Sequence, residues 1–135
     1  MKNDDLITTA AGAIRVHRTP SGRLIGDVGA ALVTPNGHLF TGVCIDTPSW
    51  GLCAERSAMA AMVTSGWYVV AKMVAVWQHP ETEALHVLPP CGHCREFLRS
   101  IDPTNLETRI VLAQDRSSSL ADLLLEYRWP PPLDG

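Results

Sequence analysis

Two short segments of the chain carry residues that can bind a metal ion. Residues 53–56 read Cys-Ala-Glu-Arg, and residues 90–94 read Pro-Cys-Gly-His-Cys. Both coincide with predicted helix starts, where free backbone N–H groups and the positive end of the helix favour the thiolate that binds zinc. Cys91 and Cys94 are three residues apart, so they lie on one face of the first helical turn.

This cysteine pattern predicts a catalytic zinc site. Cys53, Cys91 and Cys94 supply three thiolates and leave the fourth position of a tetrahedral zinc ion open, as in catalytic rather than closed structural sites. Water in that open position becomes a usable nucleophile near neutral pH. Glu55 follows a ligand by two residues, and we expect its carboxylate to take the proton of this water and pass it to a leaving group.

The composition restricts the classes of partner. The chain has 135 residues, enough for one domain over 1–135 with its own core. Eleven basic residues are scattered among 14 acidic ones and the net charge is −3, which favours a small neutral or cationic substrate over a nucleic-acid polymer. No apolar run approaches the ~20 residues of a membrane helix. The acidic N-terminus does not resemble a secretory signal, so we expect a cytoplasmic protein.

Hydrophobic periodicity predicts alternating helices and strands. We expect strands at 28–34, 38–45, 69–77, 85–88 and 109–113, the first two joined by a hairpin at 35–37 (Pro-Asn-Gly). We expect helices at 4–17, 52–64 and 91–101, and a closing helix capped by Ser118 or Ser119. This order predicts an α/β domain layered around a mixed sheet.

Cys-x-Glu followed by Pro-Cys-x-x-Cys resembles the cytidine deaminase family in its small, three-cysteine form. The resemblance runs over about residues 28–124, and the short spacing before Cys53 is most similar to blasticidin-S deaminase. It implies a three-layer cytidine-deaminase-like fold with a five-stranded mixed sheet flanked by helices. It also implies one Zn²⁺ per subunit, a homotetramer, and hydrolytic deamination of a cytosine-type nucleoside or related aminopyrimidine.

The resemblance also assigns residues around the metal. Arg56 is expected to hydrogen-bond ligand sulfur and offset the excess thiolate charge. Cys44 and Asp46 occupy positions where the family usually carries an asparagine and a glutamate that contact ribose. Cys44 cannot replace an amide, and Asp46 has a shorter reach, so the substrate substituent is expected to differ from ribose. Trp50, whose loop leads into Cys53, is expected to bind substrate, as are two motif residues, Ala54 and Pro90.

Two other interpretations of the cysteines remain open. Cys44 as a fourth ligand would give a closed structural zinc site in a module without catalysis. The Cys-Gly-His-Cys segment also occurs in thiol-disulfide oxidoreductases, although this interpretation leaves Cys53 and Glu55 unexplained. His93 lies between two ligands in the sequence, and we expect it to point away from their face.

Overall fold

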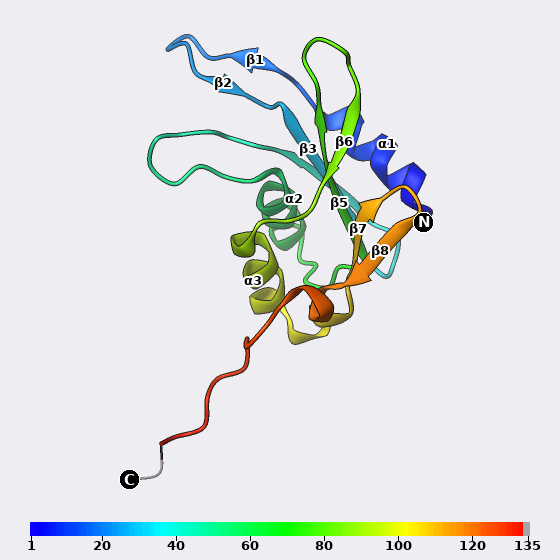
Figure 1. Ribbon diagram of the computed structural model, residues 1–135, viewed down its shortest axis with the longest axis vertical. Coiled ribbons are helices and arrows are strands. Elements are labelled where there is room, and N and C mark those ends of the chain that lie inside the picture. The colour runs from blue at the N-terminus through cyan, green and yellow to red at the C-terminus, as the bar shows by residue number, and fades with distance from the viewer. Residues whose placement is uncertain (134–135) are drawn as a thin grey trace.

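A mixed six-stranded sheet lies at the centre of the computed structural model, which describes residues 1–133 (Figure 1). Its strands follow the order β4-β3-β5-β7-β8, and β6 pairs with β5. β5 and β7 run parallel, whereas all other neighbours are antiparallel. The strands are β3 (Val28–Val33), β4 (Leu39–Val43), β5 (Lys72–Gln78), β6 (Leu85–Leu88), β7 (Arg109–Ala113) and β8 (Arg116–Ser119).

Helices cover both faces of this sheet, which gives three layers (Figure 1). Helix α1 (Asn3–Ala13) packs on one face, against alternate residues such as Val74 and Val76 of β5. Helices α2 (Ala54–Thr64) and α3 (Gly92–Ile101) pack on the other face, against Met73 and Ala75 of the same strand. Successive side chains of a strand point to opposite faces, so the apolar run of β5 serves two cores. The expected α/β layering is confirmed.

The hairpin between β3 and β4 forms at the predicted turn. Gly37 has φ +89°, a backbone conformation that glycine adopts at no steric cost. The Thr34 N–H bonds the carbonyl of His38 at 2.9 Å and closes the turn. This hairpin fixes the register of β3 against β4, with Leu32 opposite Phe40.

The first predicted helix is too long. It ends at Ala13, because Ile14 takes an extended conformation and residues 17–25 form a small hairpin. That hairpin joins β1 (His17–Arg18) to β2 (Leu24–Ile25) around a turn in which Gly22 has φ +88°. The turn at residues 19–22 therefore joins two strands.

The predicted closing helix is replaced by a strand and a short 3-10 helix, although Ser119 is a cap residue as predicted. Residues 116–119 form β8, which pairs with the edge of β7, so the sheet has six strands rather than five. Ser119 accepts a hydrogen bond from the backbone N–H of Asp122 at 3.3 Å and caps only a short 3-10 helix, η2 (Leu120–Leu123). A similar turn, η1 (Pro103–Glu107), precedes β7. Among residues 1–133, no helix is long and apolar enough to cross a bilayer.

Candidate active site

Two helix starts on the same face of the sheet bring the three cysteines together. Cys53 is the N-cap residue of α2 and Cys91 the N-cap residue of α3, with Cys94 in the first turn of α3. The sulfur atoms of Cys53 and Cys91 are 3.6 Å apart, and those of Cys91 and Cys94 are 3.4 Å apart. The structure thus joins candidate ligands that are separated by 38 residues in the sequence.

These sulfur positions fit a zinc ion. Tetrahedral coordination with Zn–S bonds of about 2.3 Å places two sulfur atoms about 3.8 Å apart, close to the observed separations. All three thiols are free, and they form one group of candidate metal ligands. Cys94 is buried and Cys91 is exposed, so the group has a closed side and an open side. Three sulfur donors leave one tetrahedral position free for a substrate or water.

The ligand thiols lie in different electrostatic surroundings. Burial raises the pKa of Cys53 and of Cys94. Burial also raises the pKa of Cys91, but hydrogen bonds from the Cys94 N–H and from the two neighbouring thiols lower it further than burial raises it. All three must lose their protons to bind a metal, which the N-terminal ends of α2 and α3 favour.

Arg56 lies against the ligand sulfur atoms. Its Nη2 donates to the sulfur of Cys53 at 3.7 Å, and this hydrogen bond is the main cause that raises the pKa of the guanidinium. Its Nε is buried and has no hydrogen-bond partner within residues 1–133. A positive charge in this position can offset part of the negative charge of three thiolates. The contact is the one expected from the sequence, while its effect on the metal stays a prediction.

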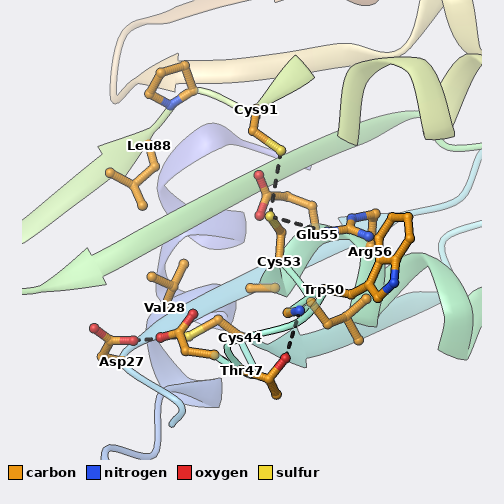
Figure 2. A pocket seen from close by; sticks show the side chains of 15 residues that line it. Asp27, Val28, Cys44, Thr47, Trp50, Cys53, Glu55, Arg56, Leu88 and Cys91 are labelled. Carbon is orange, nitrogen blue, oxygen red and sulfur yellow. Dashed lines mark hydrogen bonds between the residues drawn. The ribbon is translucent and has the colours of Figure 1, made fainter. Parts of the chain in front are cut away.

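The carboxyl group of Glu55 lies in the first turn of α2, beside the cysteines (Figure 2). The residue is only 6% exposed, and none of the side-chain hydrogen bonds within residues 1–133 involves its carboxylate. Burial raises its pKa, while its own backbone N–H and the charge of Arg56 lower it less. A carboxyl group that is buried, bonded to no other residue and open to a cavity is suited to exchange a proton with a bound molecule.

A close packing contact sets the position of this helix start. Gly42 of β4 lies beneath α2, and a Cβ atom there would be 2.5 Å from the backbone nitrogen of Ala58. Only glycine allows β4 and α2 to approach this closely. The first turn of α2, which carries Glu55, is therefore held directly on the sheet.

A pocket of about 420 Å³ opens beside Glu55 and the cysteines (Figure 2). Four of the predicted substrate-binding residues line it: Cys44, Asp46, Trp50 and Ala54. Pro90 does not line this pocket. It is buried, and its carbonyl accepts a hydrogen bond from Nε of Arg95 at 2.8 Å.

The loop that carries Asp46 and Trp50 is closed at its base. Ile45 and Leu52 form an isolated bridge, with backbone hydrogen bonds of 2.9 and 2.8 Å in both directions. Trp50 is 83% exposed at the tip, and its ring stacks on that of His93 with 6.5 Å between centroids. His93 thus contacts the rim of the pocket and does not belong to the metal-ligand group.

The sequence reasoning missed Asp27. It lines the pocket, and its Oδ1 accepts a hydrogen bond from the thiol of Cys44 at 3.0 Å. A signal was present, because the predicted hairpin alone sets the register that places Val28 beside Cys44. Extending that register by one residue brings Asp27 to the same pocket wall. Thr47 lines the pocket as well and was not predicted.

The sequence and the structure agree with a known family. Residues 3–108 match the model of the cytidine and deoxycytidylate deaminase zinc-binding region, and the chain belongs to this family. Its sequence is 33% identical over 102 residues to a cytidine deaminase of Mycoplasma genitalium, covering 71% of this chain and 74% of that protein. It is 38% identical over 72 residues to a probable cytidine deaminase of Dictyostelium discoideum, covering 52% of this chain and 46% of that protein.

Solved structures show the same architecture over nearly the whole chain. The cytidine deaminase of Burkholderia pseudomallei superposes with a TM-score of 0.72 at 28% identity, covering 93% of this chain and 98% of that one. The cytidine deaminase of Mycobacterium leprae gives a TM-score of 0.69 at 27% identity, covering 90% and 95% of the two chains. The chain therefore has the cytidine-deaminase fold expected from the resemblance.

The other two interpretations of the cysteines lose their structural basis. Cys44 groups with Asp27 and Asp46 rather than with the three ligand sulfurs, so the zinc group has no fourth cysteine within residues 1–133. The Cys91 and Cys94 pair lies beside Cys53 in a deaminase fold, whereas a dithiol oxidoreductase requires neither this third cysteine nor Glu55.

Proposed function

We propose that this protein catalyses the zinc-dependent hydrolytic deamination of a cytosine-type nucleoside or a related aminopyrimidine, with Cys53, Cys91 and Cys94 as the metal ligands. One observation carries the proposal. The buried carboxylate of Glu55 forms no hydrogen bond with any other described residue and shares a pocket with sulfur atoms at metal-binding separations. Family membership supports the same reaction.

The reaction replaces the exocyclic amino group of the ring with oxygen from water and releases ammonia. Both protons of the attacking water leave its oxygen, one passing to the adjacent ring nitrogen and one to the departing amino group, so a group that can accept and return a proton is needed. Glu55 is the catalytic residue in this role, since its carboxylate faces the pocket from the same helix start that holds Cys53. A zinc ion, when bound, lowers the pKa of water to about 7.

The remaining pocket residues have positioning and binding roles in this proposal. Arg56 offsets the charge of the thiolates through its contact with Cys53. Cys44, Asp46, Trp50 and Ala54 bind the substrate, since all four line the pocket. Pro90 supports the wall from behind, where it adjoins a small cavity beneath Glu55.

The natural substrate in this proposal carries a substituent other than plain ribose. The thiol of Cys44 already donates to Asp27, so it has no hydrogen left for a ribose oxygen. We therefore expect weak turnover of cytidine and deoxycytidine, and better turnover of blasticidin S or a modified cytidine. Ammonia release across such a panel tests this, and cytidine turning over ahead of every other compound would contradict it.

The expected homotetramer and cytoplasmic location belong to the same proposal. Large apolar side chains are exposed around the pocket rim and the C-terminal segment, among them Phe97, Leu125 and Trp129, and subunit contacts would cover them. The four cysteines form no disulfide within residues 1–133, in keeping with a reducing compartment.

The decisive experiment replaces the proposed proton carrier and keeps the metal site. We expect Glu55→Gln to fold and bind zinc like the wild type, with deamination reduced at least ~100-fold. Glu107→Gln is the matched control, because Glu107 is exposed in η1 and outside the pocket. Elemental analysis, thermal melting and ammonia release give the three readouts. Equal turnover by Glu55→Gln and the control would refute the role of Glu55.

A further inference from the structure

Two carboxylates and a thiol gather at the end of the pocket opposite Cys91 (Figure 2). Asp27, Cys44 and Asp46 make up this acidic end, and their side-chain ligand atoms lie within 4.8 Å of one another. Asp27 immediately precedes the first strand of the β3–β4 hairpin and the other two follow its second strand, so the hairpin register holds the group together.

Neither aspartate of the acidic end forms a salt bridge within residues 1–133. The salt bridge within these residues joins Arg99 to Glu96 on the exposed surface of α3 and involves neither Asp27 nor Asp46. Arg23 approaches the group, but its Nη1 donates to the backbone carbonyl of Asp46 at 3.5 Å rather than to the carboxylate. Within the described residues, the carboxylates of Asp27 and Asp46 therefore face the pocket without an ion-pair partner.

The side chains of the acidic end can accept hydrogen bonds, but none of them has a free hydrogen to donate. Carboxylates accept only, and the Cys44 thiol already donates to Asp27 at 3.0 Å. The neighbouring hydroxyl of Thr47 is engaged inside its own loop, where it accepts from the Gly51 N–H at 2.9 Å and bonds Ser49. A single hydroxyl would satisfy one acceptor and leave the charges in place. An ammonium or guanidinium group supplies several donors together with the opposite charge.

The end of the cavity that Glu55 lines gives separate evidence that a ligand binds in this pocket. Glu55 is 6% exposed, lines the same pocket, and has no side-chain hydrogen-bond partner within residues 1–133. A ring placed against Glu55 must extend its substituent into the rest of the 420 Å³ cavity, which ends at Asp27 and Cys44 (Figure 2).

We propose that the acidic end binds a cationic group, an ammonium or a guanidinium, on the substituent of the ring that is deaminated. This inference rests on the proposed function and names its substrate class. Asp27 and Asp46 are then specificity-determining residues, and they select a charged substituent over a neutral one.

Two cytosine derivatives test the inference. One carries an aminoalkyl chain on the ring nitrogen, and the other carries a hydroxyalkyl chain of the same length. We expect the zinc-loaded wild type to favour the aminoalkyl compound by about tenfold or more in kcat/KM. The double variant Asp27→Asn with Asp46→Asn should lose that preference. Asp115→Asn is the control, because Asp115 is exposed in the turn between β7 and β8, and it should keep the preference. A wild type that favours the hydroxyalkyl compound, or treats both alike, overturns the inference.

A binding measurement separates this inference from the proposed function. Uracils with the same two chains are products of the reaction, and calorimetry measures their binding to zinc-loaded Glu55→Gln without turnover. Tighter binding of the aminoalkyl uracil, with no ammonia released by the zinc-loaded wild type from any cytosine, would refute the proposed function and retain the cation site. Equal binding of both uracils refutes the cation site whatever the turnover. If the double variant does not fold, Asp46→Asn alone serves, since Asp46 is exposed at the pocket mouth.

Discussion

Adding one methyl group beneath α2 should disturb the active site from outside the pocket. In Gly42→Ala, the new Cβ would be 2.5 Å from the backbone nitrogen of Ala58 and 2.7 Å from the side chain of Ser57. Ordinary contact begins at 3.4 Å, so the backbone of α2 must move by about 0.9 Å. This movement would shift Cys53 and Glu55, which begin the same helix.

The expected losses follow from that displacement. Overpacking of this kind costs about 1–3 kcal/mol of unfolding free energy, which lowers the melting temperature of a chain of this length by roughly 4–12 °C. A misplacement of about 1 Å in catalytic groups reduces turnover by roughly 100-fold. Thermal melting reports the loss of stability, and ammonia release, measured well below the melting temperature, reports the loss of turnover. Zinc content shows whether the metal site is retained.

Gly12→Ala provides the matched control for this substitution. Gly12 lies near the end of α1, and a Cβ atom there would meet nothing within 4 Å. Alanine is the better helix former, so this variant should be more stable by up to about 1 kcal/mol, with unchanged turnover. If Gly42→Ala melts and turns over like the wild type, β4 does not set the position of the helix start and the packing argument is wrong.

Three further sets of variants test the metal group and the core. Single alanine variants of the ligands Cys53, Cys91 and Cys94 should each lose zinc, whereas Cys44→Ala should keep about one zinc per chain, as elemental analysis can decide. Arg56→Ala leaves the thiolate charge uncompensated, so turnover should fall, and unchanged turnover together with unchanged zinc content would refute the charge argument. Asn105→Ala removes three hydrogen bonds to backbone groups of other segments, 2.8 to 3.1 Å long, from a fully buried side chain. We expect a loss of about 3 kcal/mol or more in denaturant unfolding, against almost none for the exposed Asn36→Ala.

The sequence predicts the central strands and the two helices of the site because their signals are local. The local sequence is enough to predict the buried strand β5 and the Pro-Asn-Gly turn, and the structure confirms both. The errors lie at the ends of the chain, where pairing partners decide. Residues 17–25 and 116–119 have weak local preferences and become strands only because another strand lies beside them.

The chemistry of the site was easier to predict than its specificity. Cys53, Cys91 and Cys94 follow a spacing pattern along the sequence, so the sequence alone predicts them as metal ligands. Asp27 belongs to no such pattern, and its position in the pocket depends on the register between β3 and β4. Pro90 has a position in the motif but lies behind the wall, a difference that only side-chain packing decides.

The bridge between Ile45 and Leu52 separates changes in the loop at the pocket mouth from changes in the metal centre, whether evolution or an engineer makes them. It seals the intervening loop at its base with two backbone hydrogen bonds, which depend on no particular side chain. Substitutions or exchanges within residues 46–51 can therefore remodel the mouth of the pocket while the chain still enters Cys53 along the same path. The loop is an interchangeable module on a fixed catalytic frame, and new substrate preferences can arise there without rebuilding the metal centre.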